Sequence, residues 1–474
     1  MKNNIVTVIF LITLFFSCKH VPENGIKDKQ KPNVVFFLVD DLGYSDISCF
    51  GSDFYQTPNI DKLATLGVKF INGYAACTVC SPTRASIMTG KYPARIRCTD
   101  WIEGFKAPYK KLKSPEWTMY MDTTEYTIAE AFKDAGYVTG HFGKWHLGEK
   151  EKYWPENNGF NVNVGGWAKG SPNRNKKLGF NGYFSPYGNP RLEDGIPGEH
   201  LTERLTQEAC SFIDNNKNTP FFLNFWFYNV HKPIQAKKEK IKKYKTLVDP
   251  NKKQTNPEYA AMVEHMDDAV GKVMQQLKEN DLLKNTIIVF TSDNGGLVGK
   301  EAIKITNNYP LRGGKGQIYE GGVRVPNIIV APGVTKANTV SEVPMISLDY
   351  YPTLLHLTGV KIPDIIKKDL EGENLVALMK NDENIKREAI YWHYPHYHKQ
   401  GASPYSAIRK GDWKLIHLYE NNIYELYNLR QDIGENNNLC TLYIDKKEEL
   451  QLALENWLHK VNAQMPILNP NYQK

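Results

Sequence analysis

The sequence has few cysteines, no apolar run long enough to cross a membrane and no strong excess of one charge. Its seven cysteines, at positions 18, 49, 77, 80, 98, 210 and 440 of 474, are too widely spaced for a disulfide scaffold. The net charge of +7 is a mild basic bias that suits an anionic ligand. The chain lacks the clustered basic and aromatic residues of a nucleic-acid-binding protein, so we expect no nucleic-acid partner.

The N-terminus resembles an export signal. Lys2 precedes the apolar run Ile5–Phe16, and a small residue and Cys18 follow it. The run is shorter than the stretch of about 20 residues that spans a bilayer. This order is typical of a bacterial lipoprotein signal peptide, although plain secretion is an alternative. We therefore expect a signal peptide over residues 1–18, a lipid on Cys18, a polar tether over 19–31, and an exported, membrane-anchored protein in the periplasm or at the outer membrane surface.

The middle of the chain alternates apolar strands with amphipathic helices. Val34–Val39 and the stretches 220–233 and 285–296 each contain a continuous apolar run, typical of a strand buried on both faces of a parallel sheet. Residues 256–280 have the periodicity of a long helix with one apolar face. Residues 32–385 are therefore predicted to form an α/β domain, with a large, mixed, mostly parallel sheet sandwiched by helices.

The pattern changes over residues 386–474. Short alternating strands are separated by turns at Lys410-Gly411 and at 420–422, and a helical stretch closes the chain at 446–464. We expect a small C-terminal antiparallel α+β subdomain here.

Polar residues follow three of the predicted buried strands. They are Asp40-Asp41, His231 and Asp293-Asn294. Ligands bind beyond the carboxyl ends of strands in open α/β sheets, so these residues are predicted to share one crevice. Taken singly, such pairs are common as turns or helix caps. Taken together, their oxygen atoms favour a hard cation, Ca²⁺ or Mg²⁺.

Basic residues occupy comparable loops. Lys144 and His146 lie in "GKWHLG", His231 in "NVHKP" and Lys315 in the glycine-rich "LRGGKGQIYEGG". A lone loop histidine or lysine is usually structural or merely exposed. As a group with the carboxylates, these residues predict a cationic pocket around a divalent metal, suited to a tetrahedral anion.

Cys77 and Cys80 lie in "CTVCSPTRASIMTG". Pro82 favours the first turn of a helix that Gly90 ends, which places Cys80 at the helix N-terminus, where negative charge is stabilised. Arg84, four residues on, lies on the same side. A redox pair and a zinc site are the alternatives for the two cysteines. No second CxxC or histidine pair stands at zinc-ligand spacing.

The pattern Cys80-Ser81-Pro82-Thr83-Arg84 resembles the motif of the formylglycine-dependent (type I) sulfatases, in the alkaline-phosphatase-like superfamily. The resemblance continues, in family order, through "VDDLGYSD", "GKWHLG", "HKP", "SDNGG", "LRGGKG", "DYYPTLLHLTGV" and "YELYNLRQDIGENNNL". It implies the superfamily's fold and the activity of a sulfuric ester hydrolase.

The resemblance also implies a mechanism. A formylglycine-generating or sulfatase-maturing enzyme would oxidise Cys80 to 3-oxoalanine, whose hydrate supplies the nucleophile and a metal-bound oxygen. The cation, Ca²⁺ rather than Mg²⁺, would be held by Asp40, Asp41, Asp293, Asn294 and the modified Cys80. The remaining implied roles are hydrate stabilisation by Arg84 and Lys144, sulfate binding by Lys315 and His231, protonation of the leaving alcohol by His231 with Lys315, and proton removal from the second hydroxyl by His146.

The expected substrate is a sulfated polysaccharide or its oligosaccharides, either an algal glycan such as ulvan or carrageenan, or a glycosaminoglycan. Aromatic residues in 99–104, 165–170 and 393–398 are candidates to line the pocket. The lysine-rich stretch Lys237–Lys245 is either a solvated helical face or a surface that retains an anionic polymer. The rival interpretations are a phosphomonoesterase or phosphodiesterase of the same superfamily, and a non-catalytic glycan-binding lipoprotein.

Overall fold

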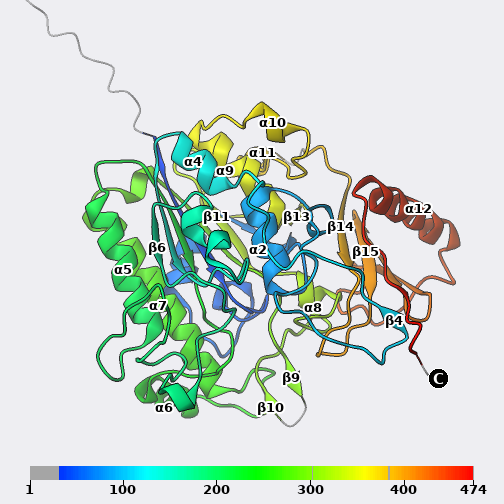
Figure 1. The fold of residues 1–474 in the computed structure, drawn as a ribbon, viewed down its shortest axis with the longest axis horizontal. Helices are drawn as coiled ribbons and strands as arrows, with labels where there is room; N and C mark the ends of the chain where they lie inside the picture. Colours follow the sequence, from blue (N-terminus) through cyan, green and yellow to red (C-terminus); the bar gives the residue numbers. More distant parts are fainter. Residues whose placement is uncertain (1–30, 301–302, 383–384, 473–474) are drawn as a thin grey trace, which may run out of the picture. The chain divides into compact units, whose positions relative to one another are not determined.

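An eight-stranded sheet forms the centre of the computed structural model (Figure 1). The strand order is β12-β2-β11-β8-β1-β7-β5-β6. Neighbouring strands from β8 to β6 run parallel, whereas β11 is antiparallel to both β8 and β2. The strands are β1 (Asn33–Val39), β2 (Val68–Phe70), β5 (Val138–Gly143), β6 (Val162–Val164), β7 (Phe221–Trp226), β8 (Thr286–Ser292), β11 (Asn327–Val330) and β12 (Thr339–Ser341).

Helices cover both faces of this sheet because its central strands are apolar on both faces. On β1, Val35 and Phe37 pack into the layer of α1, α5 and α7, while Val34 and Phe36 pack into the layer of α2, α4 and α9 (Figure 1). These helices are α1 (Pro58–Leu66), α2 (Cys80–Thr89), α4 (Ile128–Asp134), α5 (Leu201–Asn215), α7 (Pro257–Glu279) and α9 (Tyr350–Thr358). The predicted fold class, a mixed and mostly parallel sheet between helices, is confirmed.

A second, antiparallel sheet lies near the C-terminus. Its strands follow the chain in the order β14-β15-β16-β17, and α12 packs against it (Figure 1). These elements are β14 (Ala389–Tyr394), β15 (Tyr405–Lys410), β16 (Trp413–Leu418), β17 (Ile423–Asn428) and α12 (Ile444–Lys460). The turns between β15 and β16 and between β16 and β17 are those predicted from the sequence.

Short elements complete the chain. The small helices are α3 (Pro93–Ile96), α6 (Lys238–Lys245), α8 (Glu320–Val323), α10 (Asp364–Lys367) and α11 (Val376–Met379). Three two-stranded pairings are formed by β3 (Gly73–Tyr74) with β13 (Met345–Ile346), β9 (Gly299–Lys300) with β10 (Ile303–Lys304), and β4 (Leu112–Lys113) with β18 (Ile467–Leu468).

The structure describes residues 31–472, apart from 301–302 and 383–384. The predicted signal peptide, Cys18 and nearly all of the predicted tether lie outside the described residues. Over the described part of the chain, no helix has the length and apolar character needed to cross a membrane.

Candidate active site

The carboxyl ends of four neighbouring strands meet the N-terminus of α2. Asp40 and Asp41 follow β1, Lys144 follows β5, and Asp293 follows β8. The loop after β7 leads to His231. Because the central strands are parallel, their carboxyl ends lie at one edge of the sheet, and the residues predicted from the sequence are brought together there.

Cys80 begins α2, and the whole helix is buried. Val79, in extended conformation, precedes it, and Gly90 ends it with a left-handed backbone (φ 68°) that favours glycine. The Cys80 Sγ lies 3.3 Å from the Lys315 Nζ. Burial raises the pKa of the Cys80 thiol to about 11, although the charges of Lys144 and Lys315 lower it. An unmodified Cys80 is therefore a neutral thiol and a weak nucleophile at neutral pH.

Three buried carboxylates are each paired with a buried cation. Asp40 Oδ2 lies 2.8 Å from Lys144 Nζ, Asp293 Oδ2 lies 2.7 Å from the Arg84 guanidinium, and Asp41 Oδ1 lies 2.5 Å from Lys315 Nζ. Arg84 also donates to the Lys144 carbonyl at 2.9 Å. Arg84 and Lys144 thus contact the acidic residues directly, and this pairing allows three charges to remain buried together.

Several acidic-site oxygens have no hydrogen-bond donor. They are Asp40 Oδ1, Asp41 Oδ2 and Asn294 Oδ1, all buried. One ligand atom from each of Asp40, Asp41 and Cys80 lies within 4.8 Å of the other two. Burial, and then the charges of Asp293 and Asp41, raise the pKa of Asp40 to about 8, although Lys144 lowers it. Buried oxygens without donors and crowded carboxylates fit a hard divalent cation.

The backbone at this site is unusual. Asp41 and His146 both have φ 62°, in the left-handed region that residues other than glycine rarely adopt. Asp293 Oδ1 accepts a hydrogen bond from the Asp41 N–H at 3.2 Å, and Asn294 Nδ2 donates to Asp41 Oδ1 at 2.8 Å. These contacts hold the Asp41 carboxylate toward the other acidic residues.

His146 and His231, the two histidines predicted from the sequence, each donate a hydrogen bond to a backbone carbonyl. The ring nitrogen that faces this carbonyl therefore carries the proton. His146 Nε2 lies 3.0 Å from the Ile102 carbonyl, so its neutral ring donates from Nε2 and leaves Nδ1, which is buried and unpartnered, with a free lone pair. His231 Nδ1 lies 2.8 Å from the Lys232 carbonyl, so its Nε2 faces Asp41 Oδ2 at 3.7 Å. Burial and then the charge of Lys315 lower the pKa of His231 to about 3.

These groups open into a cavity of about 300 Å³. Cys80, His146, His231 and Lys315 line it, together with His398 and Lys399. Burial and the charge of Lys315 lower the pKa of Lys399. A cavity with a thiol, three lysines and three histidines can bind an anion and exchange protons with it.

Comparisons with known proteins identify the family. A family model described as Sulfatase matches residues 32–360, and one described as N-sulphoglucosamine sulphohydrolase, C-terminal, matches residues 314–464. The chain belongs to the sulfatase family. A sulfatase of Formosa agariphila is 31% identical over 94% of this chain and 92% of that protein. The N-acetylgalactosamine-6-sulfatase of Rattus norvegicus is 31% identical over 77% of this chain and 68% of that protein.

The structural comparison agrees. The crystal structure of Ps i-CgsB in complex with k-i-k-neocarrahexaose matches with a TM-score of 0.76 and 31% identity, over 94% of this chain and 95% of that one. The family is the type I sulfatase family of the alkaline-phosphatase-like superfamily, as the sequence motifs suggested. The chain is accordingly a sulfuric ester hydrolase.

The cavity of this sulfatase is less aromatic than its sequence suggested. Trp101 and Ala168 to Gly170 line it, but Tyr394 is buried against Tyr405 instead. Of the predicted stretch 393–398, only His398 reaches the cavity. All residues of β14 except Tyr391 are buried, which the aromatic composition of the stretch did not reveal. Lys399 was missed, although it directly follows this stretch.

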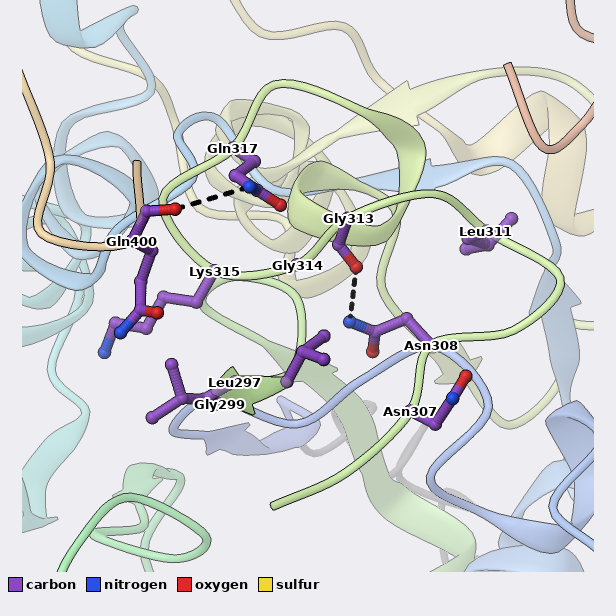
Figure 2. A pocket seen from close by; sticks show the side chains of 11 residues that line it. Leu297, Gly299, Asn307, Asn308, Leu311, Gly313, Gly314, Lys315, Gln317 and Gln400 are labelled. Carbon is purple, nitrogen blue, oxygen red and sulfur yellow. Dashed lines mark hydrogen bonds between the residues drawn. The ribbon is translucent and has the colours of Figure 1, made fainter. Parts of the chain in front are cut away.

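A second cavity of about 340 Å³ shares Lys315 with the first (Figure 2). Its lining is rich in amides, and Gln317 Nε2 donates to the Gln400 carbonyl at 3.3 Å. The consecutive residues Lys399 and Gln400 thus line different cavities of the sulfatase. The glycine-rich turn around Lys315 separates the two.

Proposed function

We propose that this sulfatase hydrolyses sulfate esters on a sulfated polysaccharide or its oligosaccharides, with Cys80 acting as formylglycine beside a divalent cation. The observation that carries the proposal is the position of Cys80. It begins a buried helix on the wall of a cationic cavity, 3.3 Å from Lys315 and next to three oxygens that lack donors.

The relatives support a carbohydrate substrate. One matching structure holds a neocarrahexaose, and another, 26% identical with a TM-score of 0.70, is described within the metabolism of glycosaminoglycans by Bacteroides thetaiotaomicron. The cavity contains lysine ammonium groups, the Ser171 hydroxyl and the Trp101 ring, which suit a sulfated sugar, and carrageenan-like galactans and glycosaminoglycans are the first compounds to test.

The residues that would hold the cation are Asp40, Asp41, Asp293, Asn294 and the modified Cys80. We propose Ca²⁺, with Mg²⁺ second, because all the protein donors are oxygens. When bound, the cation supplies positive charge to the transferring sulfate, and formylglycine supplies a nucleophile stronger than a neutral thiol. Lys144 lies 2.8 Å from Asp40 and Arg84 lies 2.7 Å from Asp293, and these contacts hold both carboxylates at the site.

The cavity residues divide the remaining tasks. Lys315 and Lys399 attract the sulfate group, because both ammonium groups belong to the cavity wall. His146 is suited to accept a proton, since burial and the charge of Lys144 lower its pKa and its Nδ1 lone pair is free. Lys315 and His231 are the candidates to protonate the departing alcohol.

The proposal is tested on the full chain, produced with and without a formylglycine-generating enzyme. Sulfate release is measured on carrageenan and glycosaminoglycan oligosaccharides, and the peptide around position 80 is analysed by mass spectrometry. Release should accompany conversion of Cys80, and Cys77→Ala should retain it. Full activity with an intact Cys80 thiol would contradict the formylglycine assignment, and activity only on non-carbohydrate sulfates would contradict the substrate.

The cation is tested separately by chelation. Activity lost on treatment with a chelator should return with Ca²⁺, and less completely with Mg²⁺. Asp40→Asn and Asp41→Asn should weaken cation binding measured by calorimetry, because each removes a negative ligand. Recovery with Zn²⁺ alone would show that the oxygen ligands were assigned to the wrong metal.

We also propose the organisation and location expected from the sequence. A signal peptide over residues 1–18, a lipid on Cys18 and a tether over 19–31 precede a catalytic domain over 32–385 and a C-terminal subdomain over 386–474. The support is the order of residues around the apolar run. Lipid labelling that persists in Cys18→Ser would disprove the anchor.

A further inference from the structure

A third cavity, of about 480 Å³, lies between residues 105–114 and the C-terminal segment 469–471. Strand β4 pairs with β18 (Figure 1). The Asn469 side chain donates to the carbonyls of Pro108 and Lys110 at 2.8 Å each. Asn469 also donates from its backbone to the Lys111 carbonyl at 2.9 Å. These bonds hold two distant parts of the chain in one fixed arrangement.

The segment of residues 105–114 is strongly basic. It carries Lys106, Lys110, Lys111 and Lys113, and none of these four has a carboxylate within 4.0 Å among the described residues. The Lys110 ammonium instead lies over the ring of Tyr397, 5.5 Å from its centroid. Positive charge that is not neutralised by the protein remains available to an anionic ligand.

Helix α6 offers a contrast. From the sequence, the lysine-rich stretch 237–245 is one candidate surface for retaining an anionic polymer. In the structure Lys237 pairs with Glu203, and Lys240 and Lys243 both pair with Glu264. Much of that positive charge is therefore neutralised within the protein.

The lining of the third cavity supplies the other groups that a sulfated sugar requires. Phe105, which is 38% exposed, offers a ring face for the apolar side of a sugar. Lys106 and Lys113 offer charge to a sulfate group, and Asn471 offers an amide for a hydroxyl. A sulfated sugar combines these three features in one unit.

The third cavity is connected to the catalytic cavity through the chain. Trp101 to Glu103 line the catalytic cavity, and Phe105 lines the third one only two residues later. The Asp100 carboxylate accepts from the backbone N–H groups of Trp101, at 2.8 Å, and Phe105, at 3.3 Å. One rigid turn therefore carries residues of both cavities.

We propose that this cavity is a non-catalytic binding site for a sulfated sugar unit, which holds a polysaccharide on the enzyme while the catalytic cavity acts on another unit. The choice of ligand rests on the proposed function. An anionic membrane surface is the competing binder, because Tyr109 and Leu468 are 87% and 72% exposed on the same segments. The concave shape and the amide in the lining favour a sugar.

The experiment measures retention of the full chain in gels containing carrageenan or its desulfated form, in a Cys80→Ala background so that no sulfate is removed. Lys106→Gln with Lys113→Gln should weaken binding to carrageenan about tenfold and reduce its salt dependence. Phe105→Ala, which keeps every charge, should weaken it about threefold. The matched control is Lys238→Gln with Lys242→Gln on α6, which removes the same charge elsewhere and should bind as the parent protein does.

Activity separates this proposal from the proposed function. With Cys80 intact, the double variant should lose activity on carrageenan polymer at low concentration but keep its activity on a small aryl sulfate. If the double variant binds carrageenan more weakly, but the enzyme with Cys80 intact releases sulfate from no glycan, the binding site is supported and the glycan substrate is refuted.

Three results would overturn the site. The first is that the α6 control weakens carrageenan binding as much as the double variant does. The second is that the double variant and Phe105→Ala are both retained as the parent protein is. The third is that the double variant loses binding to phosphatidylglycerol vesicles but not to carrageenan. If the double variant fails to fold, the comparison of Phe105→Ala with its parent decides the question.

Discussion

At the scale of single residues, His146 and His231 carry their protons on different ring nitrogens, so they are suited to different proton transfers. The free Nδ1 of His146 is ready to accept a proton. His231 has its free nitrogen toward the Asp41 carboxylate, and its lowered pKa makes it neutral, so its Nε2 has no proton to give unless it is first charged. Lys315, whose pKa is raised because Asp41 and Cys80 outweigh the effect of burial, always carries protons.

This difference can be measured through the leaving group. Sugar alkoxides depart poorly without a proton, whereas nitrophenolate departs unaided, so loss of the proton donor should slow sugar sulfates by about 10² to 10⁴ and aryl sulfates far less. Comparing kcat on both substrates for His231→Ala and Lys315→Ala identifies the donor as the variant with the selective loss. His146→Ala should slow both substrates equally, because the role proposed for His146 comes after the alcohol has left. An equal loss on both substrates for His231→Ala and Lys315→Ala would exclude both as the donor.

At the scale of elements, Asp46 joins the loop after β1 to two other segments. Its Oδ2 accepts from Tyr259 on α7 at 2.6 Å and from the Gly43 N–H at 2.8 Å. Its Oδ1 accepts from Thr306 at 2.6 Å and from Gln254 at 2.9 Å. The loop that carries Asp41 is thereby fixed from both sides.

Asp46→Ala should therefore destabilise the protein. Four buried donors lose this acceptor, although the Gln254 amide still donates to the Ser45 carbonyl at 2.9 Å. Each group left unsatisfied costs about 1–3 kcal/mol, so the free energy of unfolding in urea should fall by about 3 kcal/mol or more. Asp53→Ala, at an exposed site whose carboxylate lies 3.9 Å from Lys252, should change it by less than about 0.5 kcal/mol. If Asp46→Ala lowers the free energy of unfolding as little as Asp53→Ala does, water replaces the lost acceptor.

The sequence predicted the elements better than the details of the cavity. The apolar runs of β1, β7 and β8 are local signals, and so is the Pro82 that marks the start of α2. The polar ends of these strands could be grouped because parallel strands share an edge. Lys399 and the buried Tyr394 could not be assigned, because which residues at the end of β14 and in the β14–β15 connection face the cavity depends on contacts with distant segments.

At the scale of the whole molecule, one lysine joins the C-terminal sheet to helix α8. Lys414 on β16 lies 2.9 Å from both Glu320 on α8 and Glu435, and all three side chains are buried. Burial raises the pKa of Glu435 to about 7, helped by the charge of Glu320 and opposed by Lys414. The pKa of Glu320 is lowered to about 2, because Lys414 and Arg324 outweigh its burial.

These opposite shifts predict how stability depends on pH. Because its pKa is raised, Glu435 stabilises the folded protein below about pH 4.5, and this contribution to the free energy of unfolding is lost as the pH rises through 7. Glu320, whose pKa is lowered, makes a contribution that is lost only as the pH falls through 2. Glu435→Gln should therefore flatten the fall in unfolding free energy between pH 5 and 8, measured in urea. Glu388→Gln, at an exposed carboxylate, should keep the parent curve. An unchanged slope in Glu435→Gln would mean that Glu435 is ionised throughout.

The burial of α2 has a consequence for the order of events in the cell. From Cys77 to Arg84 no residue exceeds a few per cent exposure, and Cys80 itself is 2% exposed. An enzyme that recognises this segment as a peptide cannot reach it in the finished fold. The oxidation proposed for Cys80 must therefore compete with folding itself, and under that proposal a chain that folds too quickly is left permanently with a thiol. The yield of active protein is then decided by the relative speed of two processes, so that a slower-folding variant can give more active enzyme.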